Sequence, residues 1–191
     1  MRLFVALEIP SALRTSFAAL MTDLRALDTE SSAKKPSWTR PENLHVTLKF
    51  MGNVAPDKFD DIRAALAGVR SERSVELRFG GLGFFPDARR PRFVWASIAA
   101  SQNLGAIAAA IDRGVAGFGV PNEQRAFTAH LTLARCQHGA ISSSLRTTIQ
   151  KDAARDFGGF RTNEFHLIES KLKSSGAEYT TLQTFVFAAE D

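Results

Sequence analysis

Two copies of one short motif hold the residues of this sequence that could do chemistry: His45-Val46-Thr47-Leu48 and His130-Leu131-Thr132-Leu133. Successive side chains of a β-strand point to opposite faces, so the histidine and the threonine of each copy share one face. The apolar residues between them share the other face, which in the first copy is expected to include Phe50. Each copy therefore predicts a strand with a core side and a chemical side.

Imidazole suits acid and base catalysis because its ordinary pKa of about 6.5 lets one ring be neutral while its partner is protonated near neutral pH. Each such proton transfer contributes on the order of 10² to 10⁴ in rate and needs no metal. A threonine hydroxyl two residues along the strand, roughly 7 Å from its histidine, can donate to an anion between them. Two histidines and two threonines therefore suit a phosphate that is attacked by water on one side and loses a protonated leaving group on the other.

Other site types fit the sequence less well. Each strand offers one good zinc ligand, whereas a zinc site needs three or four, so metal binding is the weaker interpretation. Cys136 is the single cysteine and is expected to be a small buried hydrophobe at a strand end. The glycine cluster Gly80-Gly81-Leu82-Gly83 lacks the lysine of a phosphate-binding loop and is interpreted as a turn or hinge that ends a strand.

Three further residues are candidates for substrate binding. Phe85 and Arg92 belong to a connection rich in arginine, and arginine beside an aromatic ring can hold a phosphate and stack a base. The alternative, a ring packed inward and arginines on a solvated loop, stays open. Arg135 follows the second motif, and whether it joins the motif face depends on a bulge, since 130, 132 and 134 are the positions in phase.

The other titratable candidates are assigned structural or incidental roles. They are His138 in an expected loop, His166 in an apolar strand pattern and Tyr179 on the last strand. A tyrosine at that place could line the site, but a buried ring with a satisfied hydroxyl is the simpler expectation.

Composition bounds the class of protein. The 191 residues are 45% hydrophobic and 23% charged, enough for a substantial core in one domain or two small lobes. The formal charge of +4 favours acidic ligands only mildly. The first residues reach Glu8 and Pro10 too early for a signal peptide, and no run approaches the roughly 18 apolar residues of a membrane span. We therefore expect a cytoplasmic protein without a membrane association.

Hydrophobic periodicity predicts alternating strands and helices. The first half should contain a strand at 2–8, a helix capped by Ser11, a loop at 28–37, a His strand at 43–51, a helix from Pro56 and a strand at 75–79. The second half should contain a strand at 93–99, a helix through 104–115, a His strand at 128–135, a helix through 141–149 and strands at 165–168 and 179–187.

The order strand, helix, His strand, helix, strand thus occurs twice. It predicts an α+β fold, one bilobal domain over 1–191, with pseudo-repeats at about 1–80 and 92–170 and a closing strand at 177–188. If the two copies pack face to face, the two histidines lie near a pseudo-twofold axis.

The two motifs resemble the paired H-x-T-x motifs of the 2H phosphoesterases. Several other segments resemble the bacterial RNA 2',3'-cyclic phosphodiesterase family, also called the 2'-5' RNA ligase family: 2–7, Trp38, 41–45, Pro91-Arg92 before Trp95, and Arg135. The resemblance covers nearly the whole chain. Ala129 stands where proline commonly precedes the second histidine, and Phe93-Val94 is a bulkier variant before Trp95.

The resemblance implies duplicated β-α-β-α-β units whose mainly antiparallel sheets line a central cleft. It also implies hydrolysis of a terminal 2',3'-cyclic phosphate on RNA to a 2'-phosphomonoester, with His45 as proton donor and His130 as proton acceptor. Thr47 and Thr132 would hold the non-bridging oxygens, and Arg135 would contact the phosphate. No cofactor and no metal are expected.

Three alternatives stay open. The chain could be a non-catalytic module that binds nucleotides or RNA, or it could act on a small cyclic phosphodiester such as ADP-ribose cyclic phosphate, or on 2'-5' linked oligonucleotides. Reverse 2'-5' ligation is possible in the family but would not be driven by ATP, because the chain lacks a nucleotide-activating lysine motif. The expected partners are RNA ends or small nucleotides, and the chain is expected to be a monomer.

Overall fold

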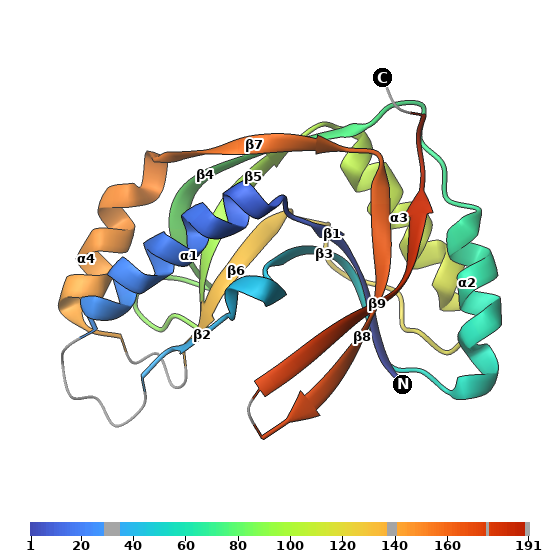
Figure 1. Ribbon diagram of the computed structural model, residues 1–191, viewed down its shortest axis with the longest axis horizontal. Coiled ribbons are helices and arrows are strands. Elements are labelled where there is room, and N and C mark those ends of the chain that lie inside the picture. The colour runs from blue at the N-terminus through green and yellow to red at the C-terminus, as the bar shows by residue number, and fades with distance from the viewer. Residues whose placement is uncertain (29–34, 137–140, 175, 190–191) are drawn as a thin grey trace.

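The computed structural model describes residues 1–28, 35–136, 141–174 and 176–189. Nine strands in the described residues form two sheets (Figure 1). Their bounds are β1 Arg2–Glu8, β2 Ser37–Trp38, β3 His45–Asn53, β4 Val75–Phe85, β5 Phe93–Ala100, β6 His130–Arg135, β7 Asp156–Thr162, β8 Glu164–Lys173 and β9 Gly176–Val186. The helices are α1 Ser11–Ala26, α2 Phe59–Ala67, α3 Asn103–Ala116 and α4 Ser143–Lys151, with short 3₁₀ turns at Pro41–Asn43, Pro56–Lys58 and Asp152–Ala154.

The two sheets have matching strand orders. The first sheet runs β3-β1-β8-β9 and the second runs β2-β6-β5-β4-β7, and every pair with a recorded register is antiparallel. Strand β4 follows the first His strand in the chain but pairs in the second sheet, and β8 follows the second His strand but pairs in the first. The two halves of the chain therefore interleave, and each sheet contains strands from both halves.

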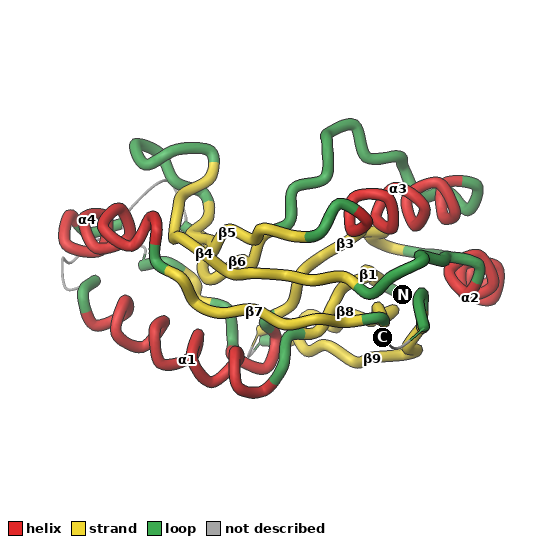
Figure 2. Tube along the Cα trace, turned by 90° about the horizontal axis from the view of Figure 1, so that it is seen from above, coloured by secondary structure: helices red, strands yellow, loops and turns green. Residues whose placement is uncertain are grey.

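Helices α1 and α3 each pack on the sheet that holds the other half's His strand (Figure 2). Helix α1 packs on the second sheet, where the ring of Phe17 lies 5.6 Å from that of Phe79 and 5.3 Å from that of Phe157. Helices α2 and α3 contact each other beside the first sheet, and α3 contacts β3. One continuous apolar core joins both layers, because α1, α3, α4 and strands of both sheets contribute to a single buried cluster. Burial of this shared core fixes the two sheets relative to each other.

Most of the predicted elements are confirmed, with three local corrections. The first helix starts at Ser11, but its N-cap is Pro10 and no side chain caps it, so the predicted cap is wrong. Strand β3 begins at His45 because Pro41–Asn43 forms a 3₁₀ turn. Strands β2 and β7 were not predicted: the first is two residues long, and the second carries Gly158 and Gly159 and has no fully buried residue.

The glycine cluster does not end its strand. Strand β4 continues to Phe85, and its pairing with β5 shifts register between Gly80 and Leu82. Gly81 has a φ of 69°, and a Cβ there would lie 2.2 Å from the carbonyl oxygen of Ala153. The glycines therefore allow a bulge and close packing inside the strand, which a turn assignment from composition alone did not recognise.

In the ranges that the structure describes, no helix is both long and apolar enough to cross a membrane. Residues 29–34, part of the predicted loop at 28–37, lie outside the described ranges, as does His138.

Candidate active site

The first His strand is bulged at the last residue of its motif. In the pairing of β3 with β1, Thr47 lies opposite Ala6 and Lys49 lies opposite Val5, so Leu48 is the extra residue. The motif face, called the inner face of the first sheet below, therefore carries His45, Thr47 and then Phe50, which pairs with Phe4. The prediction that Phe50 shares the core face with Val46 is wrong: Phe50 is 59% exposed, because a bulge reverses the alternation of side chains.

The second His strand carries a bulge at the matching place. Thr132 lies opposite Trp95 and Ala134 lies opposite Val94, so Leu133 is the extra residue in β6. Arg135 then pairs with Phe93 and comes into phase with His130 and Thr132 on the inner face of the second sheet. Strand alternation alone did not decide which face Arg135 occupies, and the bulge places it on the inner face. Its guanidinium lies 5.4 Å from the centre of the Phe93 ring.

Both histidine rings are held in the same way. His45 Nδ1 lies 2.7 Å from the carbonyl oxygen of Asn43, and His130 Nδ1 lies 2.9 Å from that of Thr128. A carbonyl oxygen only accepts hydrogen bonds, so each Nδ1 carries the proton and donates it. In each ring this leaves Nε2 as the nitrogen that can accept or release a proton at the site.

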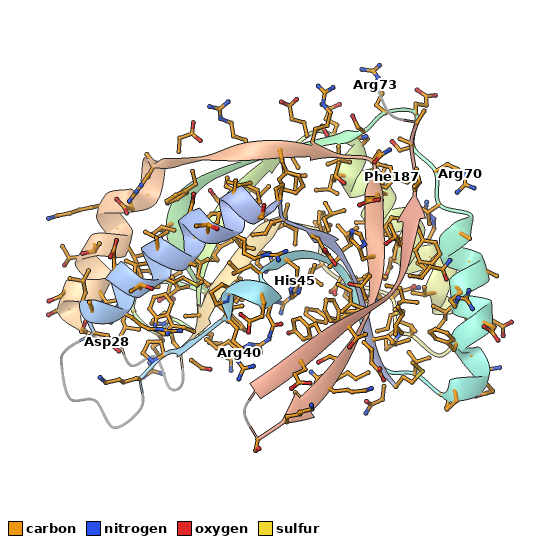
Figure 3. The ribbon with its side chains drawn as sticks, viewed as in Figure 1. Asp28, Arg40, His45, Arg70, Arg73 and Phe187 are labelled. Carbon is orange, nitrogen blue, oxygen red and sulfur yellow. The ribbon has the colours of Figure 1, made fainter. Side chains whose placement is uncertain are left out.

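The two rings belong to one electrostatic site. Burial lowers the pKa of His45 below its ordinary value, and the charges of His130 and Arg135 lower it further. The hydrogen bond to Asn43 and the carboxylate of Glu8 act in the opposite direction. Strands β3 and β6 approach each other in the middle of the molecule (Figure 1), and Figure 3 shows His45 in this central region. The structure therefore brings together the two motifs that the sequence singled out.

Aromatic side chains enclose His45 more than His130. The His45 ring lies 4.8 Å from the ring of Phe4 and 5.4 Å from that of Tyr179, whereas His130 is exposed and lies 5.6 Å from the Trp95 ring in an edge-on contact. Trp95 itself lies against Gly83, where a Cβ would come within 2.8 Å of its Nε1. Tyr179, expected to be structural, is thus a direct neighbour of His45.

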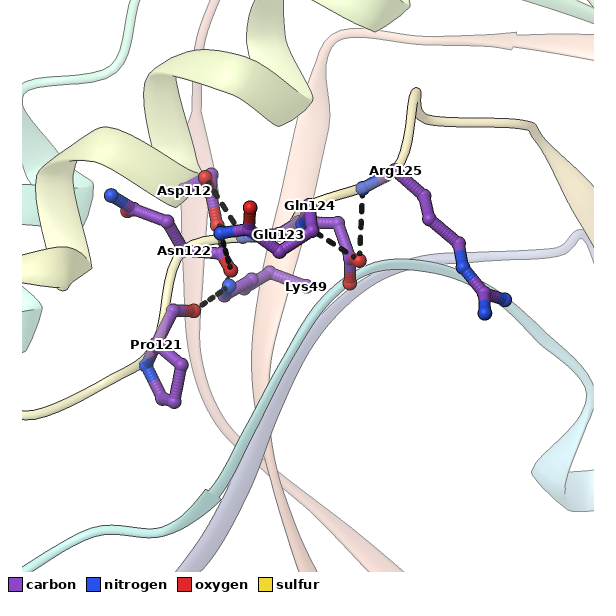
Figure 4. A network of polar contacts seen from close by, with 7 residues as sticks. All are labelled: Lys49, Asp112, Pro121, Asn122, Glu123, Gln124 and Arg125. Carbon is purple, nitrogen blue, oxygen red and sulfur yellow. Dashed lines mark hydrogen bonds and ion pairs between the residues drawn. The ribbon is translucent and has the colours of Figure 1, made fainter.

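A polar network that the sequence did not suggest connects the first His strand to the segment between α3 and the second His strand (Figure 4). Lys49 is 6% exposed and donates to Asp112 of α3 and, at 2.5 Å, to the carbonyl oxygen of Pro121. The same carboxylate accepts the backbone N–H of Glu123 at 3.1 Å. Burial opposes ionisation of Asp112, but the hydrogen bonds from Lys49 and Glu123 outweigh it and lower its pKa. The network anchors the segment leading to His130 on the strand that carries His45.

A second connection reaches His45 from the β8–β9 hairpin. Asn43, whose carbonyl oxygen holds the His45 ring, donates from Nδ2 to the carbonyl oxygen of Ala177 at 2.8 Å. On the other side of the site, Thr39 donates from Oγ1 to the carbonyl oxygen of Thr132 at 3.0 Å. Side chains of the segment 39–43 therefore bind the backbone of β9 at Ala177 and that of the second His strand at Thr132.

The remaining candidates lie around this centre or away from it. Phe85 is 47% exposed at the end of β4, and Arg92 is exposed just before β5. Cys136 is 6% exposed, and burial raises the pKa of its thiol to about 11, so the prediction of a buried small hydrophobe is confirmed. His166 is 7% exposed, with Nδ1 3.0 Å from Thr184 Oγ1, which agrees with a structural role.

The described residues form a cavity away from the histidines and no cluster that could hold a metal. A cavity of about 500 Å³ lies at the end of α1, lined by Arg25, Ala26, Asp28, Lys35, Pro36 and Trp38. Trp38 pairs with Ala134, which faces the core, so this cavity lies across the second sheet from His130. Across the described parts of the chain, no three histidine, cysteine or acidic side chains gather into a possible metal site.

The sequence and the fold are similar to those of known proteins. Residues 12–173 match the model of the 2'-5' RNA ligase superfamily. The chain is 28% identical to an RNA 2',3'-cyclic phosphodiesterase of Archaeoglobus fulgidus over 97% of this chain and 99% of the relative, and 30% identical to one of Aquifex aeolicus over 78% and 80%. The crystal structure of TT0787 of Thermus thermophilus superposes with a TM-score of 0.79 at 26% identity, covering 98% of both chains. The chain therefore belongs to the 2'-5' RNA ligase superfamily.

Proposed function

We propose that this protein hydrolyses a terminal 2',3'-cyclic phosphodiester on RNA to a 2'-phosphomonoester. The observation that carries the proposal is the pair of matched imidazoles, each with Nδ1 bound to a backbone carbonyl and Nε2 left for proton transfer. The curated relatives reported above, which are named RNA 2',3'-cyclic phosphodiesterase, support the same reaction.

The reaction needs one base and one acid on opposite sides of the phosphorus. His130, neutral, takes a proton from water at Nε2 while the water oxygen bonds to phosphorus. The bond from phosphorus to the 3' oxygen breaks, and His45, protonated at Nε2, gives its proton to that oxygen. The products are a free 3' hydroxyl and a 2'-phosphomonoester, so atoms and charge balance in a single addition of water.

Three other inner-face residues act on the phosphate in this scheme. Thr47 and Thr132 follow their histidines on the same faces and donate hydrogen bonds to the non-bridging oxygens. Arg135 adds a fixed positive charge, and its bulge directs it to the same face as His130. Phe85 at the end of β4 and Arg92 just before β5 are proposed to contact the rest of the substrate.

The lowered pKa of His45 is compatible with its role as proton donor. A bound phosphodiester is an anion, and a nearby negative charge favours the protonated ring. Substrate binding therefore raises the pKa of His45 toward the range in which it can protonate the leaving oxygen. The free protein holds the ring beside His130 and Arg135, both of which disfavour its charge until the anion arrives.

The proposed setting is the cytoplasm, where the protein acts as a monomer on RNA ends or on small nucleotides with a 2',3'-cyclic phosphate. No cofactor takes part in the scheme, because the water, the two imidazoles and the hydroxyl donors supply every step.

Incubation with an oligoribonucleotide that ends in a 2',3'-cyclic phosphate tests the proposal. We expect one product, identified by phosphorus NMR as a 2'-phosphomonoester, and no turnover by His45→Ala or His130→Ala. Tight binding without product would favour a non-catalytic RNA-binding module. Turnover of ADP-ribose cyclic phosphate with none of the oligoribonucleotide would leave the chemistry in place and overturn the RNA assignment.

A further inference from the structure

The end of the β8–β9 hairpin projects beyond the first sheet (Figure 1). Strand β8 pairs with β1 through residues 166–169. Beyond this stretch, the described residues 170–173 and 176–179 pair with each other and with no third strand. A two-stranded hairpin is only marginally stable in water by itself, so contacts with the rest of the molecule decide where this end lies.

The segment that leads into the first His strand contacts the projecting end. Asn43 donates from Nδ2 to the carbonyl oxygen of Ala177 at 2.8 Å. One residue earlier in β9, Gly176 has a φ of 120°, and a Cβ there would lie 3.6 Å from Nε of Arg40. Glycine therefore allows both the backbone conformation and the close approach of the hairpin. The hairpin end is thus docked on residues 40–43.

The docked end covers His45. Tyr179 follows Ala177 by two residues in β9, and its ring centre lies 5.4 Å from that of His45 and 4.9 Å from that of Phe4. Among the causes that lower the pKa of His45, burial is the largest. The position of the hairpin end therefore decides how much of this burial Tyr179 supplies.

Asn43 acts on His45 from two directions. Its carbonyl oxygen accepts a hydrogen bond from His45 Nδ1 at 2.7 Å, while its side chain holds the strand that covers the ring. Its backbone N–H donates to the carbonyl oxygen of Arg40 at 2.9 Å, which fixes the turn itself. At the second motif the equivalent residue is the exposed Thr128, and His130 is exposed as well. The side-chain link to the hairpin and the cover of the ring therefore occur together at the first motif.

We propose that Asn43 is a positioning residue, whose side chain docks the end of the β8–β9 hairpin and so keeps the Tyr179 ring on His45. The inference rests on the proposed function only for its consequence in catalysis, which is the environment of the proton donor. Removal of one hydrogen bond should lower the ratio of docked to undocked hairpin by about 2- to 13-fold.

Undocking changes the burial of His45 more than the charges around it. The charged groups that act on the ring are Glu8 of β1 and His130 and Arg135 of β6, none of which belongs to the hairpin. The charged side chains of the projecting end form ion pairs within the hairpin, Lys173 with Glu178 at 2.6 Å and Lys171 with Glu169 at 3.3 Å. Loss of the Tyr179 cover should therefore raise the pKa of His45.

The test compares the wild type with Asn43→Leu, which keeps the shape of the side chain and removes its donor. Hydrogen exchange followed by NMR should show that protection of the backbone amides at 177–179 falls by the same 2- to 13-fold. An NMR titration of the imidazole Cε1 proton should show the midpoint of His45 moving to higher pH. Tyr179→Leu removes the cover and leaves Asn43 in place, and it should move the midpoint in the same direction.

Asn103→Leu is the matched control. Asn103 also donates from Nδ2 to backbone carbonyl oxygens, those of Arg73 at 2.9 Å and Ser74 at 3.1 Å, and it makes no recorded contact with His45 or the hairpin. This variant should change neither the exchange at 177–179 nor the titration of His45. Equal changes in both asparagine variants would indicate a general loss of stability and would overturn the inference.

Three other results would overturn the inference. The first is an Asn43→Leu protein with the wild-type exchange and the wild-type titration. The second is a Tyr179→Leu protein in which the His45 midpoint does not move. The third needs no variant: in the wild type, exchange at 177–179 as fast as in an unstructured chain would show that the hairpin end is not docked. None of these measurements uses turnover, so a wild type that binds but does not hydrolyse the cyclic phosphate would refute the proposed function separately.

Discussion

On the inner face of the first sheet, His45 lies against the rings of Phe4 and Tyr179, and burial lowers its pKa. On the inner face of the second sheet, His130 is exposed, touches the edge of Trp95 and has Arg135 beyond it. The backbone hardly differs between the two places, since each histidine donates from Nδ1 to the carbonyl two residues before it and each motif has a bulge at its last residue.

The two histidines share their backbone geometry and differ in their surroundings. The shared backbone geometry leaves Nε2 of each ring available for proton transfer, and two-sided proton transfer requires two such nitrogens. The different part gives the rings unequal surroundings, and unequal surroundings let two chemically identical groups take opposite roles. A symmetric site would hold two equivalent imidazoles and would give neither of them a preferred role as acid or base.

Removal of either imidazole is the change with the largest expected effect. His45→Ala and His130→Ala should each lower kcat by a factor of about 10² to 10⁴ or more, because each ring supplies one proton transfer. Rates with the cyclic phosphate substrate and the melting temperature should be measured together, and the melting temperature should stay close to that of the wild type. Near wild-type turnover in either variant would contradict the two-histidine scheme.

The two His strands also differ at the fourth residue after the histidine. This residue is the buried charge Lys49 in β3 and the buried Ala134 in β6. Lys49→Met should lower the free energy of unfolding by about 3–5 kcal/mol, because it removes the ammonium that donates to Asp112 and to the carbonyl of Pro121. Denaturant unfolding measures this.

The double variant Lys49→Met with Asp112→Leu should recover most of that loss, because it removes the buried ammonium and its half-buried carboxylate partner together. Lys58→Met is the exposed control, expected to cost less than about 1 kcal/mol, since its ion pair with Asp57 is solvated. Equal effects of Lys49→Met and Lys58→Met would show that the network does not stabilise the fold.

Arg135 is the main charge that distinguishes the second inner face. Arg135→Gln should lower kcat/KM by about 10- to 150-fold, the range expected for one hydrogen bond to a charged group. Arg63→Gln, on α2 and away from both inner faces, should retain wild-type kcat/KM. If the two variants behave alike, Arg135 does not contact the reacting phosphate.

The smallest expected effects are shifts of the bell-shaped pH profile of kcat/KM. One limb of the profile reports the pKa of His45 in the free protein. Removal of the carboxylate in Glu8→Gln lowers that pKa and should move this limb to lower pH, whereas Arg135→Gln raises the pKa and should move the same limb to higher pH. A profile in which neither variant moves a limb would contradict the titration of His45 in catalysis.

Periodicity was enough to find most of the elements. The apolar stripes of α1 and α3 lie on buried faces, with Phe17, Leu20 and Leu24 buried in the first and Leu104, Ile107 and Ile111 in the second. Strand β7 escaped prediction because edge pairing with β4, and not its own apolar content, holds it in the sheet. The glycines of β4 suggest a turn by composition but serve close packing, which depends on neighbours distant in sequence.

The sequence alone determined that each histidine lies on the same strand face as its threonine, because strand alternation depends only on local backbone geometry. Tertiary structure decided everything that depends on partners. Pairing with β1 and β5 created the bulges that turn Phe50 and Arg135 to the inner faces. The exchange of β4 and β8 between sheets then gave the two histidines different neighbours, since burial and charge are properties of the assembled layers and not of either motif.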